Sequence, residues 1–161
     1  MAPMHRIAIS GHRGLPVPTA DLIDKAIRAA LAEHAPEVTG ISCLADGADQ
    51  IFARAVTDLG GKLEVIIPAA RYRARLPAEA QPEYDGLLAQ AVAVRHMPFT
   101  ESSSESHMEA SKAMMDQADE LFAVWDGQPA RGYGGTADVV AYAREHGTPV
   151  CVIWPPGAVR D

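Results

Sequence analysis

The sequence is poor in cysteine and lacks the residue spacings that are typical of metal sites. It holds two cysteines, Cys43 and Cys151, and each lies in an apolar run. Such positions favour buried free thiols, which suit a reducing compartment. No CxxC pair and no pair of histidines at helical spacing is present. We therefore expect no structural zinc, no other bound metal and no cofactor.

Long hydrophobic runs and an excess of positive charge are absent as well. No segment approaches the length of a membrane span, and no apolar leader stands at the amino terminus. The formal net charge of -7 argues against a general nucleic-acid binder, which needs a basic face to neutralise phosphates. The one dense basic cluster, at residues 71–75, is expected to be a solvated loop. These absences predict a cytoplasmic protein that binds neither membranes nor nucleic acid in general.

Apolar runs alternate with helical patterns along the chain. Strands are expected at Ile7–Ile9, Thr39–Leu44 and Leu63–Ile67, with amphipathic helices between them. A hydrophobic content of 48% and a charged content of 22% are ordinary for a globular protein. No repeat, linker or low-complexity tail divides the sequence. The pattern predicts a single α/β domain over residues 1–161, a sandwich with a mainly parallel sheet.

The clearest signal for a ligand lies in the last strand–helix–strand unit. An apolar run at residues 121–125 predicts a buried strand, a polar loop rich in glycine follows at 126–136, and a helical pattern extends to Glu145. Parallel sheets bind ligands outside the carboxyl ends of their strands, which is where this loop is expected. The sequence therefore predicts a binding loop between Trp125 and Thr136.

The residues of this loop suit a phosphate. The first turn of a helix has unpaired N–H groups and carries the positive end of the helix dipole. Gly132, Gly134 and Gly135 would let a phosphate approach the backbone closely. Thr136 could cap the helix or donate to a phosphate oxygen. The alternative is that these glycines only make a turn.

The loop after the first strand is a second candidate anion site. It consists of Ser10, Gly11, His12, Arg13 and Gly14. Arg13 could pair with a phosphate, and Gly11 and Gly14 could expose backbone to it. The alternative is an ordinary loop between a strand and a helix, with a solvated arginine.

The loop after the second strand contributes acidic groups, within the segment Asp46, Gly47 and Asp49. Asp46 or Asp49 could cap the helix that follows. Alternatively, either carboxylate could accept a hydrogen bond from a ribose hydroxyl, as acidic residues do in dinucleotide-binding folds. Farther along the chain, His107 could carry a proton, although we expect it to face the solvent.

Three stretches together resemble one family of nucleotide-binding proteins. They are Ser10-Gly11-His12-Arg13, the segment from Leu44 to Phe52, and Gly134-Gly135-Thr136. In this order, over nearly the whole chain, they are similar to the Rossmann-like superfamily that joins DNA-processing protein A to the LONELY GUY (lysine-decarboxylase-like) proteins. The resemblance implies a Rossmann-like three-layer sandwich that binds a nucleotide or a nucleotide derivative.

Some members of the groups that this chain resembles are enzymes. The LONELY GUY enzymes cleave the N-glycosidic bond of nucleoside monophosphates, and residues 118–136 also resemble nucleoside 2-deoxyribosyltransferases. In both groups a glutamate lies three residues past the threonine, where this chain has Val139. Asp138 is one residue earlier, about 100° away around the helix. The resemblance therefore supports the binding site better than the catalytic step.

Two functions follow from these observations. The first is a sensor or carrier that holds the phosphate of its ligand on Gly11–Gly14 and on Gly132–Thr136. The alternative is a phosphoribohydrolase or a deoxyribosyltransferase-like enzyme in which Asp138 stabilises or captures a sugar cation. A nicotinamide oxidoreductase fits less well, because the first loop lacks the full G-x-G-x-x-G spacing. A homodimer is expected, since related folds often pair through helices beside the site.

Overall fold

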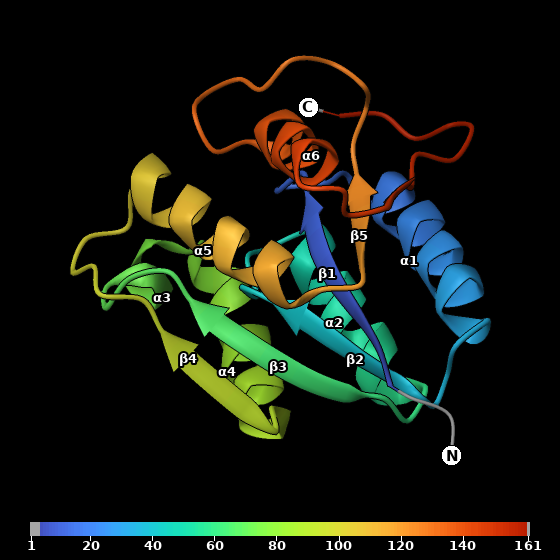
Figure 1. The fold of residues 1–161 in the computed structure, drawn as a ribbon, viewed down its shortest axis with the longest axis horizontal. Helices are drawn as coiled ribbons and strands as arrows, with labels where there is room; N and C mark the ends of the chain where they lie inside the picture. The colour runs from blue at the N-terminus through green and yellow to red at the C-terminus, as the bar shows by residue number, and fades with distance from the viewer. Residues whose placement is uncertain (1–3, 161) are drawn as a thin grey trace.

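The structure is a computed structural model that describes residues 4–160. Six strands form one sheet, with the bounds β1 His5–Gly11, β2 Val38–Ser42, β3 Lys62–Ile67, β4 Ala93–His96, β5 Glu120–Val124 and β6 Val150–Val152. A 3₁₀ turn at Ala78–Ala80 accompanies the helices, which are α1 Val17–Ala32, α2 Ala48–Asp58, α3 Tyr72–Arg75, α4 Gln81–Gln90, α5 Ser104–Gln117 and α6 Thr136–Glu145. Neighbouring strands are all parallel, in the order β4-β3-β2-β1-β5-β6 (Figure 1). The predicted α/β sandwich is confirmed, and its sheet is parallel throughout the described residues.

The central strands bury side chains on both faces of the sheet, and β5 shows how. Leu121 and Ala123 pack in the core beneath α5 and α6, whereas Phe122 and Val124 pack with α1 and α2. Successive side chains of a strand point to opposite faces, so a strand covered on both sides is apolar at every position. This is why a continuous apolar run marked the strand in the sequence.

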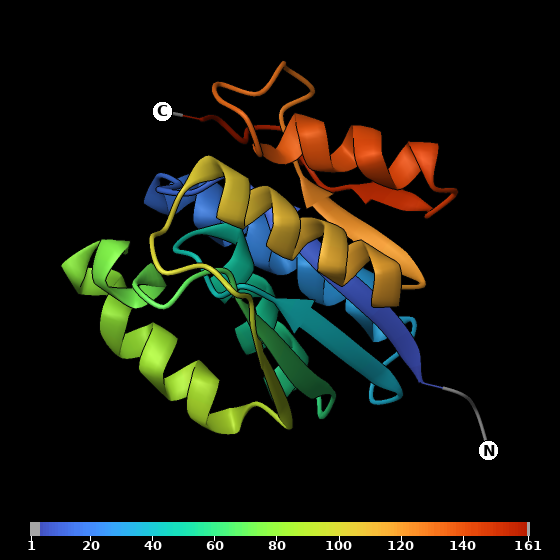
Figure 2. The same cartoon turned by 60° about the vertical axis from the view of Figure 1, so that its left-hand side comes forward.

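Helices cover both faces and give the three layers that the resemblance implied. On one face α1 packs against α2 and α2 against α4, and on the other α5 packs against α6 (Figure 2). The chain moves outward from β1 through β2 and β3 to β4, then returns to place β5 on the other side of β1. The loops after β1 and β5 therefore lead to helices on opposite faces. The place where neighbouring strands lead to helices on opposite faces is the topological switch point of the sheet. Open parallel sheets bind ligands there.

The basic cluster at residues 71–75 contains the short helix α3 rather than the plain loop that we expected. Its arginines have carboxylate partners, with Arg73 Nη2 at 2.7 Å from Asp85 Oδ2 and both Arg71 and Arg75 facing Glu101. The cluster is thus neutralised within the chain.

None of the helices within residues 4–160 has the length and apolar content needed to cross a membrane.

A close approach of α2 to the sheet tests this packing. A Cβ on Gly40 of β2 would lie 2.7 Å from Val56 Cγ2 and 2.8 Å from Phe52 Cε2. We expect Gly40→Ala to lower the free energy of unfolding by roughly 1–3 kcal/mol, because the core has no room for the methyl group. The matched control is Gly86→Ala in α4, where a Cβ meets nothing within 4 Å. The control should gain roughly 0.5–1 kcal/mol in urea unfolding, and equal effects of the two substitutions would contradict the packing.

Candidate functional site

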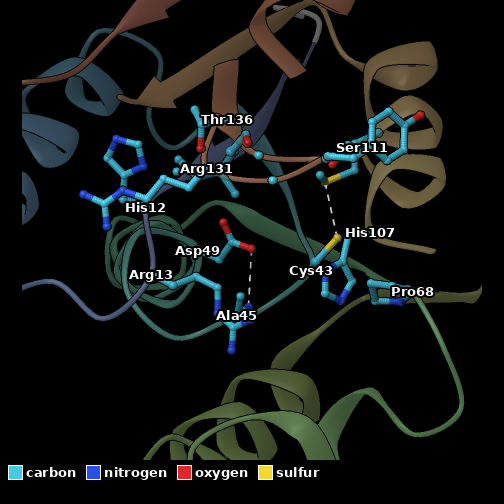
Figure 3. Close-up of a pocket in the computed structure, with 18 of the residues that line it drawn as sticks. His12, Arg13, Cys43, Ala45, Asp49, Pro68, His107, Ser111, Arg131 and Thr136 are labelled. Atoms are coloured by element: carbon cyan, nitrogen blue, oxygen red, sulfur yellow. Dashed lines mark hydrogen bonds between the residues drawn. The ribbon is translucent and has the colours of Figure 1, made fainter. Parts of the chain in front are cut away.

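A cavity of about 340 Å³ opens at the switch point between β1 and β5. This volume falls in the range of roughly 300–1,000 Å³ that small-molecule sites occupy. The end of β1, the starts of α2 and α6 and the loops beside them supply the predicted residues that line it (Figure 3): Ser10, Gly11, His12, Arg13, Asp49, Gly132, Gly134, Gly135 and Thr136. Segments that the sequence placed in three separate loops thus share one site.

Asp46, Gly47 and Gly14 do not line this cavity but support its wall. The Asp46 carboxylate accepts hydrogen bonds from Arg13 Nε at 2.8 Å and from the Gly14 N–H at 3.1 Å. Gly47 precedes the first turn of α2 with φ 86°, and a Cβ there would lie 2.6 Å from the His12 carbonyl oxygen. No side chain caps α2. The capping role that the sequence allowed for Asp46 is therefore wrong, and Asp46 instead positions Arg13.

Asp138 also lies outside the cavity lining. Its Oδ2 accepts a hydrogen bond from the Gly134 N–H at 2.9 Å, which fastens the glycine loop to the first turn of α6. The carboxylate is thus occupied by the backbone of its own loop. Asp138 therefore stabilises the conformation of the binding loop without lining the cavity.

The amino end of α6 faces the cavity with free donors. Within the described residues, the N–H groups of Thr136 and Ala137 have no hydrogen-bond acceptor. Gly135 occupies the cap position and no side chain caps the helix, so the predicted capping by Thr136 is wrong. The Thr136 hydroxyl instead points into the cavity (Figure 3). Two amides, a hydroxyl and the positive end of the helix dipole make this corner suited to an anion.

The two neighbouring glycines of the loop are needed for different reasons. Gly134 has φ 85°, and a Cβ there would lie 2.9 Å from the Ser104 carbonyl oxygen of α5. Gly135 has φ -70°, which any residue adopts. A Cβ on Gly135 would lie 2.9 Å from Ala130 Cβ, so the missing side chain lets the loop close on itself. The shape of the loop therefore requires the missing side chain at Gly135.

Positive charge gathers around the cavity although the chain is acidic overall. Arg13, Arg131 and Arg160 line it, and Asp49 is the single carboxylate among its described lining residues. Arg160 comes from the last segment, which is held by Thr19 of α1. The Thr19 hydroxyl donates to the Val159 carbonyl oxygen and accepts from the Val159 N–H, each at 3.0 Å. The sequence interpretation missed Arg160, because nothing in the pattern connects residue 160 to a loop near residue 10.

His12 is a buried neutral histidine at the same site. Its Nε2 accepts a hydrogen bond from the Asp126 N–H at 3.0 Å, so the proton of the neutral ring lies on Nδ1. Burial lowers the pKa of His12, and the charges of Arg160 and Arg131 lower it further against the opposing effect of Asp126. The ring is therefore uncharged at neutral pH. It adds polarity to the cavity without adding to its cationic charge.

An apolar lobe forms the other side of the cavity and was missed by the sequence interpretation. Cys43, Pro68, Tyr72 and Met114 line it. Cys43 and Pro68 directly follow β2 and β3, so the rule that carboxyl ends of parallel strands share one edge could have identified them. Tyr72 and Met114 come from helices, where no loop signal marks them.

His107 belongs to this lobe too, so the expectation that it faces the solvent is wrong. Its Nε2 lies 2.8 Å from Ser102 Oγ, and its ring stands edge-on to Tyr72 at a centroid distance of 5.6 Å. Burial lowers the pKa of His107, and the charge of Arg13 lowers it further. A neutral imidazole beside an aromatic ring favours a flat, uncharged ligand group at this end of the cavity.

Asp49 lies between the cationic corner and the apolar lobe, where it is 8% exposed. Its Oδ2 accepts from the Ala45 N–H at 3.3 Å and does not cap α2. Burial raises the pKa of Asp49 to about 7, although the Ala45 hydrogen bond and the charge of Arg13 oppose the rise. The carboxyl can therefore act as either hydrogen-bond donor or acceptor near neutral pH.

Comparison with known proteins gives a fold and no closer identity. No family model matches the sequence, and no curated protein matches it. Solved structures do match, and they include DNA processing protein A from Streptococcus pneumoniae, with TM-score 0.71 and 18% identity over 98% of this chain. The chain spans about half of that protein, 52% of its length.

Two further structures have the same fold. DNA processing protein A from Helicobacter pylori, solved to study its single-stranded DNA binding mode, has TM-score 0.69 and 12% identity, covering 97% of this chain and 68% of that one. The molybdenum cofactor binding protein from Rippkaea orientalis has TM-score 0.62 and 12% identity, covering 94% and 77%. The Rossmann-like fold shared by these groups is confirmed for this chain. The likeness to deoxyribosyltransferases stays a prediction.

The raised pKa of Asp49 predicts a pH-dependent cost of burying this carboxyl. The folded pKa of about 7 lies above the ordinary value of about 3.9, so the protonated form stabilises the fold at low pH. This stabilisation is lost as the pH rises from about 4 through about 7. We therefore expect the gain in unfolding free energy from Asp49→Asn to grow by roughly 2–3 kcal/mol between pH 5 and pH 8.

Urea unfolding of both proteins at several pH values measures this difference. Asp58→Asn at the exposed carboxyl end of α2, where Asp58 pairs with Arg28, is the matched control and should not show the rise. A difference between Asp49→Asn and the unchanged protein that stays constant from pH 5 to pH 8 would show that Asp49 ionises normally.

Proposed function

We propose that the protein binds a nucleotide or a nucleotide derivative in this cavity, as a carrier or sensor. The observation that supports this most directly is the joining of two environments in one site. Unpaired amides at the start of α6 stand at one end, and an apolar lobe with Tyr72 stands at the other. A ligand with a phosphate at one end and a flat heterocycle at the other would satisfy both.

The phosphate would rest against the first turn of α6. The N–H groups of Thr136 and Ala137 and the Thr136 hydroxyl would donate to its oxygens. Arg131 lines the same cavity and has no carboxylate within 4 Å among residues 4–160, so its charge is available to the ligand. Arg13 adds a second cation, which Asp46 holds in place through Nε.

A sugar hydroxyl would meet Asp49 between the two ends. The carboxyl can accept from a hydroxyl when ionised, and its pKa of about 7 leaves both forms populated at neutral pH. The base would enter the apolar lobe between Pro68, Met114 and Tyr72. A flat aromatic group there would gain from burial and from edge or face contacts with Tyr72.

The similar solved structures support a small-molecule site without specifying its ligand. One of them is a molybdenum cofactor binding protein, and another was solved for its binding of single-stranded DNA. Against a polymer, the net charge of this chain is -7, and its densest basic cluster is neutralised by Glu101 and Asp85. We therefore propose a free ligand of the size of a nucleotide. In a nucleotide-binding assay, a single-stranded oligonucleotide should compete poorly with this ligand.

The enzymatic alternative can be tested on the purified protein. The role proposed for Asp138 requires its carboxylate to face the ligand, whereas this carboxylate bonds to the Gly134 N–H. Incubation with nucleoside monophosphates, followed by detection of free base, separates the two functions. Binding without base release supports a carrier or sensor, and release that survives Asp138→Asn would point to Asp49 as the group to examine next.

Substitution of Arg13 tests whether the site binds the phosphate group of the ligand. If its guanidinium contacts a phosphate, Arg13→Ala should weaken a nucleoside monophosphate by roughly 1.5–3 kcal/mol and the matching nucleoside far less. Calorimetric titration of both ligands measures this difference. The control is Arg28→Ala on α1, an arginine that is likewise paired with carboxylates but lies outside the cavity. Equal losses for the nucleotide and the nucleoside would exclude a phosphate contact by Arg13.

A further inference from the structure

Two histidines and a glutamate meet at the edge of the sheet opposite the cavity. His5 opens β1, Glu120 opens β5, and His34 lies in the loop between α1 and β2. β1 and β5 begin at the same end of the sheet, and the loop from α1 to β2 lies at that end as well (Figure 1). Far apart in sequence, they come together because β1 pairs with β5 on one side and β2 on the other.

Their donor atoms converge. His5 Nε2 lies 2.9 Å from Glu120 Oε1, and the rings of His5 and His34 stack with centroids 4.1 Å apart. One ligand atom from each of the three side chains lies within 4.8 Å of the others. Around a tetrahedral ion with bonds of about 2.0–2.2 Å, ligand atoms are about 3.3–3.6 Å apart. Binding therefore requires the stacked rings of His5 and His34 to turn so that a nitrogen of each faces the ion.

The surroundings of the cluster suit a cation. Asp119 Oδ2 lies 3.9 Å from His5 Nδ1 and accepts a hydrogen bond from the Arg6 N–H at 2.9 Å. At 3.9 Å this carboxylate makes no hydrogen bond to the ring, but it adds negative charge beside it. Glu120 and Asp119 thus place two carboxylates beside the His5 ring.

We propose that His5, His34 and Glu120 form a binding site for a divalent transition metal, with Zn²⁺ as the best-fitting ion. Two imidazoles and one carboxylate are a common zinc donor set, and a fourth position remains for water. The ion would replace the proton that His5 Nε2 shares with Glu120 Oε1. It would tie the loop after α1 to the first residues of β1 and β5, so it would act on stability and not on the cavity.

No sequence pattern predicts this site, because its ligands do not follow a metal-binding spacing. His5 and His34 are separated by a whole helix, and Glu120 is carried by the strand that returns across the sheet. The expectation that the chain has no metal therefore rested on local spacing alone.

Metal titration of the tag-free, chelator-treated protein tests the proposal. We expect one Zn²⁺ per chain in competition with a chromophoric chelator, visible absorption bands with Co²⁺, and a higher Tm with Zn²⁺. His34→Ala and Glu120→Gln should each weaken binding at least about tenfold, because each removes one of the three ligands. His96→Ala in the exposed strand β4 removes a histidine elsewhere and should change nothing.

His34→Ala decides the result, because the His34 side chain makes no hydrogen bond to residues 4–160 and its removal should leave the fold intact. Circular dichroism confirms that each variant is folded. If the folded His34→Ala protein binds Zn²⁺ as tightly as the unchanged protein, the proposal is wrong. The absence of saturable binding to the unchanged protein would overturn it as well.

Discussion

The cavity depends on the close contact that Gly11, at the end of β1, makes with the start of α2 and the end of β5. A Cβ on Gly11 would clash with Ala48 Cβ and would lie 2.7 Å from Val124 Cβ, so only glycine lets the start of α2 and the end of β5 approach β1 together. The Ala48 N–H then donates to the His12 carbonyl oxygen at 3.2 Å. This contact sets the distance between the loops after β1, β2 and β5. The cationic corner and Asp49 therefore owe their spacing to one residue without a side chain.

Two of the three arginines that line the site lie beside carboxylates. Asp46 holds Arg13, while Asp126 lies 3.9 Å from Arg160 and also contacts His12. These carboxylates reduce the local positive charge and restrict the side chains at the same time. An acidic chain can thus present a small region that attracts an anion and avoid the broad basic face that a nucleic acid would need.

The sequence predicted the fold well because strands buried on both faces, such as Leu121–Val124, are apolar at every position. It also identified the loops, since glycines and polar residues interrupt those runs. It could not distinguish Gly134, which needs a positive φ, from Gly135, which needs room beside Ala130. Nor could it place Tyr72, His107 and Arg160, because their positions depend on how distant segments pack.

The hydrogen bonds between Thr19 and Val159 join two segments that lie far apart in the chain. Val159 bonds to α1, and Arg160 beside it lines the cavity. The cationic wall is thus completed by a segment that belongs to none of the six strands. A truncation before residue 159, or a bulky fusion directly after it, should therefore leave a folded protein with an altered binding wall.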